Sequence, residues 1–250
     1  MRWRSGARGW CLIIASSSVV GLTAGCGDDG GEATAAGGVD ANPPMSCPAE
    51  RDEVLGPVDA VSKGEVTVLS DESGVKTLYI DASAGGPMEQ ENNPWIYVSF
   101  EQAARVDVTD PGADASTDWD LALKRPVLRT NSGDGGPGEG GLVFLKDKAF
   151  DAVTDAEAKA AMLAIEQWFD AMCVAKKDPG GYLATTFDGW YDYGGQSTHA
   201  VSPHPGVFVL RAGKGSALYK LEILSYYTNP DGTEGMAGGR FLVRYKAIAP

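Results

Sequence analysis

The two histidines of the chain are the residues best suited to metal chemistry, because a neutral imidazole nitrogen is a common metal ligand. They are His199 and His204, which lie together in the sequence THAVSPHP. Five residues of extended chain span about 16 Å, and an odd spacing sends two side chains to opposite faces of a strand. We therefore expect the two histidines not to bind one metal ion together, unless a turn at residues 202–203 brings them closer.

Aromatic residues come just before the histidines, in the sequence FDGWYDY at residues 187–193. Trp190, Tyr191 and Tyr193 could form the walls of a ligand slot, because large rings supply apolar area with a polar tip. The same three residues could equally pack together on a sheet. Both interpretations stay open on the residues alone.

Enzymatic chemistry has little support in the sequence. No GxSxG or HExxH motif is present, and no cysteine lies near a histidine in the sequence. Acidic pairs such as Asp118/Asp120 or Asp188/Asp192 could in principle serve a glycosidase, but unpositioned carboxylates are weak evidence in a chain with 34 acidic residues. We predict that the protein is not an enzyme, with a hydrolase as the least favoured alternative.

The N-terminus is typical of an exported protein. Arginines at positions 2, 4 and 8 precede an apolar stretch, so residues 1–25 are predicted to be a signal peptide. The sequence LTAGC at residues 22–26 resembles a bacterial lipobox, in which the cysteine is acylated. Cys26 is therefore the predicted lipidation site, and ordinary cleavage that leaves a plain thiol is the alternative.

The next segment, residues 26–46, is rich in Gly, Ala, Asp and Pro and has almost no large apolar side chain. Such a stretch cannot bury enough surface to offset the entropy of ordering it. We predict a lipidated, disordered tether that lifts the remaining domain, residues 47–250, off a membrane. The domain has ample length for one sizeable core.

Of the four cysteines, Cys11 would leave with the signal peptide and Cys26 would be acylated. Cys47 and Cys173 remain, and exported proteins meet oxidising conditions. We therefore predict a disulfide between them.

The chain is acidic, with a formal net charge of −13. A protein of this charge is repelled by nucleic acid and by anionic lipid heads. Nucleic-acid binding is therefore excluded as a predicted function.

Most of the domain has the alternating apolar pattern of β-strands. Strands are expected at these segments: 65–70, 75–81, 95–100, 106–108, 206–211, 218–228 and 241–248. One α-helix is predicted over residues 154–173, because Thr154 can cap it and an apolar face follows at helical spacing. The fold class is therefore mainly β.

The central stretch, residues 117–145, reads TDWDLALKRPVLRTNSGDGGPGEGGLVFL. Two β-type runs flank a glycine-rich loop at residues 131–141. The loop lacks the Lys-Ser/Thr ending of a phosphate-binding loop. On the glycines alone we expect a mobile loop.

This stretch resembles the HmuY family, secreted haem-binding lipoproteins whose "WD-hydrophobic" strand leads into an Asn-Ser-Gly loop. The run from WYDY through VFVLR to LYKLEILSYY is a second match. The resemblance implies a two-layered antiparallel β domain that holds one haem in a cleft at its rim. The cleft would be bordered by residues 131–141 and 191–205, and the residues implied in haem binding are Asn131, Tyr191, Tyr193, His199 and His204.

On this resemblance His199 or His204 would ligate the haem iron, and family members use histidine or methionine pairs. Three methionines are available for a second ligand: Met162, Met172 and Met236. The implied role is haem capture by a lipid-anchored protein of the cell envelope, at the outer membrane. The implied partner is a haem receptor or a haemoprotein. The alternative is the same fold without haem, as a surface module for a glycan, another apolar ligand or a protein.

Overall fold

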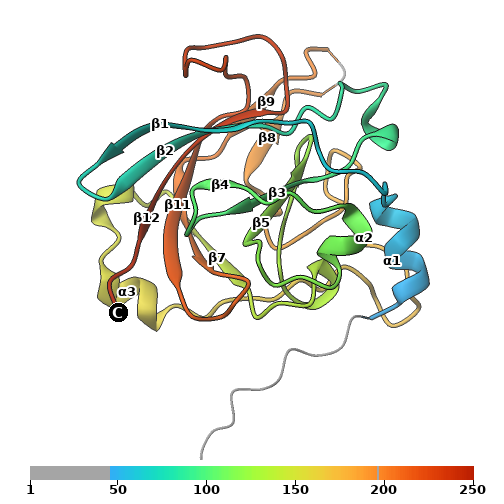
Figure 1. Ribbon diagram of the computed structural model, residues 1–250, viewed down its shortest axis with the longest axis horizontal. Coiled ribbons are helices and arrows are strands. Elements are labelled where there is room, and N and C mark those ends of the chain that lie inside the picture. The colour runs from blue at the N-terminus through green and yellow to red at the C-terminus, as the bar shows by residue number, and fades with distance from the viewer. Residues whose placement is uncertain (1–45, 196) are drawn as a thin grey trace, which may run out of the picture. The chain divides into compact units, whose positions relative to one another are not determined.

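The computed structural model describes residues 46–195 and 197–250. The predicted signal peptide, the lipidation site Cys26 and all but the last residue of the predicted tether lie outside these residues. Eighteen short elements make up the described chain, and most of them are strands that run antiparallel to their neighbours (Figure 1).

The larger sheet has six strands in the order β1-β2-β12-β11-β10-β7. These strands span Val66–Glu72 (β1), Val75–Asp81 (β2), Arg240–Ala247 (β12), Leu218–Ser225 (β11), Gly206–Arg211 (β10) and Gly141–Lys146 (β7). The order places the C-terminal strand in the middle of the sheet, where it joins the β1–β2 hairpin to the β7–β10–β11 group.

A second sheet has four strands in the order β4-β3-β5-β6, and a third is a small hairpin of β8 and β9. The four-stranded sheet is built from Ala104–Arg105 (β4), Ile96–Ser99 (β3), Leu121–Lys124 (β5) and Val127–Thr130 (β6). The hairpin pairs Tyr191–Tyr193 (β8) with Val201–Pro203 (β9).

Strand alternation explains how the two larger sheets pack. Side chains in β3, β5 and β10 alternate between two faces, and one set from each strand enters a common central core. That core joins both sheets through residues that include Leu78, Ile96, Val98, Leu121, Leu123, Phe208, Leu210, Leu221 and Val243. The predicted two-layered, mainly β fold is confirmed.

The outer faces of both sheets are also covered. Trp95, Tyr97 and Ala122 point away from the central core and pack with helix α1 (Pro48–Leu55) and with Trp168. On the far side of the larger sheet, Val207 and other residues pack with the 3-10 turn η3 (Phe150–Ala152) and helix α3 (Asp155–Ala160). The remaining short helices are η1 (Gln90–Asn92), α2 (Asp110–Ala113) and η2 (Gly133–Gly135).

The predicted helix over residues 154–173 is much shorter in the structure. Thr154 does cap it, since its hydroxyl accepts a hydrogen bond from the Glu157 N–H, but the helix ends at Ala160. Beyond that point Ala164 exchanges two backbone hydrogen bonds of 2.8 Å with Leu142 of β7. The Trp168 N–H donates to Asp134 instead of to a helical carbonyl. Tertiary pairing has therefore replaced the local helical preference, and three α-helices are present among the described residues instead of one.

The strand predicted over residues 218–228 ends earlier, at Ser225. Leu221 and Ile223 enter the core, and the next core residue is Tyr226. The β11–β12 register shifts between Ile223 and Ser225. An extra residue in one strand reverses the faces that follow it.

The N-terminal helix is tied to the domain by covalent and polar links. Cys47 and Cys173, the predicted pair, form a disulfide with Cα atoms 5.6 Å apart. Arg51 is buried and donates two hydrogen bonds to the Asp114 carboxylate and one to the Asp134 carbonyl. Together these links hold α1 against α2 and the glycine-rich loop.

Candidate functional site

The β8–β9 hairpin carries four of the five predicted binding residues. Tyr191 pairs with Pro203 and Tyr193 with Val201 across it. Trp190, directly before β8, is buried in the central core, and its indole N–H donates to the Pro126 carbonyl at 3.0 Å. The hairpin is therefore anchored at its base and leaves the tyrosines to shape its outer side.

A hollow of about 600 Å³ lies beside this hairpin, within the size range of small-molecule sites. Its walls come from the 178–180 turn, the 188–189 turn and the hairpin itself. The lining residues are Asp178, Pro179, Gly180, Asp188, Gly189, Tyr191, Asp192, Tyr193, Gly195 and His204.

The two histidines have different surroundings. His204 lines the hollow, is one-fifth exposed, and has its Nε2 3.2 Å from an oxygen of the mostly exposed Asp192 carboxylate. His199 is exposed, has a left-handed backbone (φ 52°), and is hydrogen-bonded through Nδ1 to the Tyr193 hydroxyl. Only His204 is among the lining residues of the hollow.

The two tyrosines also differ. The Tyr191 hydroxyl donates to Asp178 at 2.7 Å, and burial together with this carboxylate raises the pKa of Tyr191 well above its ordinary value. A tyrosine ligates iron as the phenolate, so Tyr191 is suited to being a wall and not a ligand. Tyr193 is 37% exposed and reaches both the hollow and His199.

Asn131 is not part of this hollow. Its side chain is fully buried, donates to the carbonyls of Ser116 and Trp119, and accepts from the Gly138 N–H at 2.9 Å. These bonds leave no part of the amide directed at a ligand. The predicted cleft between residues 131–141 and 191–205 is therefore replaced by a hollow whose other wall is the 178–180 turn.

The glycine-rich loop itself is packed, contrary to the mobile loop expected from its glycines. A Cβ on Gly133 would lie 2.2 Å from the Glu166 carbonyl oxygen, and one on Gly136 would lie 2.4 Å from the Asn131 side chain. Such contacts are impossible, so these glycines are needed for close approach of the backbone.

A comparison with known families decides the assignment of this β domain. The HmuY protein family matches residues 91–238, more than half of the chain, and the match includes both the glycine-rich loop and the β8–β9 hairpin. The chain belongs to the HmuY family. No curated protein matches it. HmuY proteins are a family of binding proteins of the haem-binding surface type, and they are not known as enzymes.

The hollow of this HmuY family member meets some of the requirements for haem and not others. It offers an imidazole from His204 and two aromatic rings from Tyr191 and Tyr193. Its other titratable groups are the carboxylates of Asp178, Asp188 and Asp192, and no lysine or arginine is among the lining residues. Haem propionates would find no cation there and would have to face solvent.

Arg129, a cation next to the glycine-rich loop in the sequence, is also committed elsewhere. Arg129 is 1% exposed, and its guanidinium carbon lies 4.9 Å, 5.6 Å and 5.0 Å from the rings of Trp95, Tyr97 and Trp119. It also donates to the Tyr97 hydroxyl and the Gly135 carbonyl. Arg129 and Trp119 thus stabilise the outer face of the smaller sheet.

Sequence reasoning missed two groups of residues. Glu166 lies completely buried beside the glycine-rich loop and was hidden inside the predicted helix. Asp178, which lines the hollow, precedes a glycine turn, but nothing in that turn indicates which ligand it faces, and Asp188 was considered only as one member of an acidic pair. The clue to Glu166 was a lone acid in the largely apolar run from Leu163 to Phe169, in which Gln167 is the one other polar residue.

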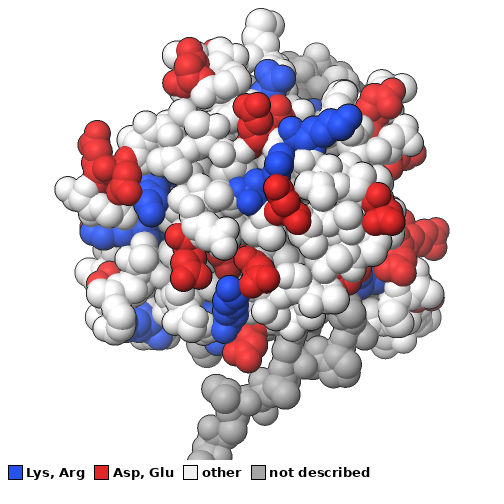
Figure 2. Space-filling model, in the orientation of Figure 1, with Lys and Arg blue, Asp and Glu red and all other residues white. Residues whose placement is uncertain are grey.

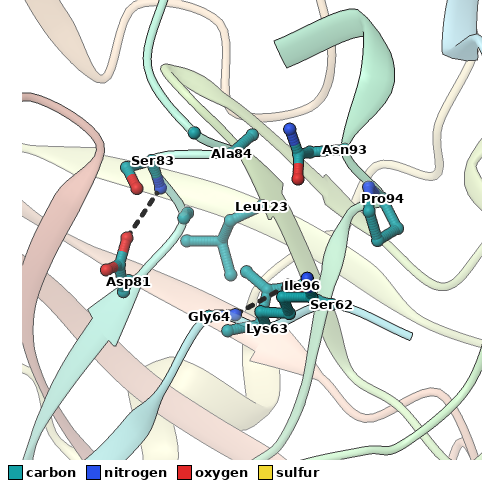
Figure 3. A pocket seen from close by; sticks show the side chains of 12 residues that line it. Ser62, Lys63, Gly64, Asp81, Ser83, Ala84, Asn93, Pro94, Ile96 and Leu123 are labelled. Carbon is teal, nitrogen blue, oxygen red and sulfur yellow. Dashed lines mark hydrogen bonds between the residues drawn. The ribbon is translucent and has the colours of Figure 1, made fainter. Parts of the chain in front are cut away.

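A smaller hollow of about 230 Å³ lies at the end of β2, and no histidine is among its lining residues. Figure 3 shows Ser62, Asp81, Ser83 and Asn93 around it, with Leu123 and Ile96 as its apolar floor. The Asp81 carboxylate already accepts from the Ser83 N–H, and the Asn93 amide donates to the Glu89 carbonyl. Because these polar groups have local partners, we assign no ligand to this hollow.

The face of the domain seen in Figure 2 carries acidic and basic side chains interspersed, with no large area of one sign. Among the described residues, no helix has the length and apolar character to cross a membrane.

Proposed function

We propose that this HmuY family member is an exported lipoprotein that captures haem in the hollow beside the β8–β9 hairpin. The observation that carries the proposal is the position of His204, which lines a hollow of about 600 Å³ together with two tyrosines. An imidazole beside aromatic walls is a suitable environment for haem iron and for the flat porphyrin ring.

In this proposal His204 supplies the imidazole nitrogen for the iron. The carboxylate of Asp192 competes for its Nε2, so the ring must turn away from Asp192 if that nitrogen is the ligand. Tyr191 acts as a wall, since its hydroxyl is bonded to Asp178. The three carboxylates of the hollow direct the propionates outwards through charge repulsion.

A second axial ligand would come from outside the present lining. His199 is near the hollow, because Tyr193 touches both its ring and the hollow, but its Nδ1 is bonded to the Tyr193 hydroxyl and we do not assign it to the iron. Met162, Met172 and Met236 are between 80% and 96% exposed, so none is committed to the core. Asn131 is left out of the proposed site.

The acidic wall of the hollow favours one alternative function. A module that has lost haem could use Asp178, Asp188 and Asp192 to bind a glycan, another apolar ligand with a cationic group, or a basic segment of a partner protein. Such a module would keep the fold and the hairpin but would not need His204.

Titration with hemin separates the two functions. Haem capture predicts a saturable, sharpened Soret band at one hemin per protein, and a much weaker response with iron-free protoporphyrin, which lacks the metal for His204. The absence of a saturable spectral change with hemin would instead support the module without haem.

The proposed location is the cell envelope, with the protein anchored to the outer membrane through acylated Cys26 and partnered by a haem receptor or a haemoprotein. The LTAGC sequence and the small-residue composition of residues 26–46 support the anchor. Cys26→Ser should move the protein from the membrane fraction to the soluble fraction. Unchanged membrane partition of that variant would contradict the anchor without affecting the haem proposal.

A further inference from the structure

A second hollow, of about 570 Å³, lies on the other side of the turn that borders the hairpin site. The turn at residues 177–183 gives Asp178, Pro179 and Gly180 to the hairpin hollow, and the remaining four residues to this one. The other walls are the end of α1, the η1 turn and the β5–β6 turn. The lining residues are Glu53, Val54, Leu55, Gly56, Gln90, Glu91, Trp95, Lys124, Val127, Lys177, Gly181, Tyr182 and Leu183.

One wall of this hollow, around Trp95, is apolar and is fixed in place. Trp95 is 4% exposed, and its indole N–H donates to the Leu55 carbonyl at 3.3 Å. The Arg129 guanidinium lies 4.9 Å from the same ring and helps hold it. Leu55 and Leu183 are also buried in the cluster around Trp95. The hollow therefore presents a preset aromatic wall, which reduces the cost of binding a flat ring.

Lys124 is the charged group inside this apolar setting. It is half-buried at the end of β5, and its ammonium lies 5.9 Å from the centre of the Trp95 ring. Within the described part of the chain, the ammonium of Lys124 forms no hydrogen bond and no ion pair within 4 Å, although its backbone is part of the β5–β6 pairing. Burial lowers the pKa of Lys124, while the more distant Asp110 partly opposes this shift. An ammonium in this position gains most from a ligand that brings a negative charge.

The remaining charges lie at the rim. Glu53, Glu91 and Lys177 are all exposed, so water screens them more strongly than it screens Lys124. Two acids and one lysine at the mouth give no strong preference for a ligand of either charge. The ammonium of Lys124 inside the hollow therefore favours an anionic ligand.

We propose that this second hollow binds a small planar aromatic anion, a carboxylate or sulfonate, with its ring against Trp95 and its charged group at Lys124. The site is separate from the hairpin hollow, whose titratable lining consists of carboxylates, tyrosines and one histidine. The two hollows on either side of this turn therefore differ in the charged side chains that line them.

A pair of fluorescent probes tests this proposal directly. 8-Anilinonaphthalene-1-sulfonate carries the required rings and anion, and N-phenyl-1-naphthylamine carries the same rings without the sulfonate. Lys124→Met removes the charge and keeps most of the side-chain stem over Trp95. Lys159→Met is the matched control, because Lys159 lies on α3 and forms no ion pair in the described chain.

The expected result is saturable binding of the sulfonate probe, weakened about five- to tenfold by Lys124→Met, the size of one partly buried charge contact. Lys124→Arg and Lys159→Met should bind the sulfonate probe as the parent does, and the neutral probe should change less than about twofold in every variant. Near-ultraviolet circular dichroism checks that each variant is folded, since partly unfolded proteins also bind the sulfonate probe.

Three results would overturn the proposal. The first is no saturable binding of the sulfonate probe to the parent, and the second is equal binding by the folded Lys124→Met variant. The third is loss of sulfonate binding when hemin saturates the protein or when His204 is replaced by alanine, because the probe would then occupy the hairpin hollow. The first two results, and the effect of His204→Ala in the third, do not depend on whether hemin itself binds.

Discussion

The glycine-rich loop and the β8–β9 hairpin are both rich in polar residues, yet they use them in opposite ways. In the loop, Asn131 and Asp134 are buried, and their side chains bond to neighbouring backbone. Around the hairpin, His204 and Asp192 face an open hollow, and the Asp192 carboxylate is mostly exposed. One region stabilises the fold, whereas the other has polar groups free to meet a ligand.

This difference separates two kinds of information in the sequence. The sequence segment that most resembles the HmuY family, TDWD followed by the Asn-Ser-Gly loop, forms a packed junction between the two sheets. The residues that we propose for haem binding lie at the hairpin, where less of the fold depends on them. The predictions below test this division, starting with the largest effect.

Glu166→Leu should destabilise the protein most. One carboxylate oxygen accepts from the Thr130 N–H and from the hydroxyls of Thr130 and Thr186, and the other accepts from the Trp168 indole and the Thr186 N–H. Removing the acceptor leaves several buried donors unpaired, so the free energy of unfolding should fall by about 3–5 kcal/mol. Urea unfolding measures it, and a loss below about 1 kcal/mol would show that the loop does not depend on this network.

Replacing Cys47 and Cys173 together with serine should lower the free energy of unfolding by about 2–4 kcal/mol. The disulfide closes a loop with a sequence separation of 126 residues and holds α1 against the domain. The comparison is urea unfolding of the double variant and of the oxidised parent. Free-thiol labelling of Cys47 and Cys173 in the unfolded, unreduced parent would contradict the disulfide itself.

Asn131→Ala should cost about 1–3 kcal/mol, since it leaves the Gly138 N–H and two carbonyls without their side-chain partner. Where this variant is folded, its hemin affinity should equal that of the parent, because Asn131 lies outside the hairpin hollow. A folded Asn131→Ala variant with strongly reduced hemin binding would restore the loop to the binding site.

The pH dependence of stability tests the environment of the buried Asp120 carboxylate. Its carboxylate accepts from the N–H groups of Phe100 and Gly213, but burial raises its pKa more than these donors lower it. The folded form therefore holds the proton more tightly than the unfolded chain, and this contribution to stability is lost as pH rises from about 4 through the raised pKa. The stability deficit of Asp120→Asn relative to the parent should shrink between pH 4 and pH 7. A deficit that grows with pH would contradict the raised pKa.

His204→Ala should have the smallest effect on stability, less than about 1 kcal/mol, because its partner Asp192 is exposed and such pairs contribute little. Thermal unfolding without hemin measures this. A larger loss would mean that the ring supports the hairpin, and the contrast between the two regions would fail.

Much of the fold could be predicted from the sequence, because alternation and turn residues are local signals. Residues 75–81 and 206–211 form strands with the predicted bounds. The Cys47–Cys173 disulfide could be predicted because an exported protein meets oxidising conditions and the other two cysteines were assigned elsewhere. The early end of the helix predicted over residues 154–173 could not be foreseen from the local sequence, because it depends on pairing with Leu142 and on burial of Glu166. The role of Asn131 could not be predicted either, since the sequence does not distinguish an asparagine buried in the fold from one that binds a ligand.

The most direct test of the account is hemin titration of the parent and of single His204→Ala and His199→Ala variants, followed through the Soret band. The account predicts that His204→Ala weakens hemin binding at least about tenfold and shifts the Soret band, whereas His199→Ala, outside the hollow, has a much smaller effect. Folded His204→Ala protein that binds hemin with the affinity and spectrum of the parent would contradict the assignment of the hairpin hollow.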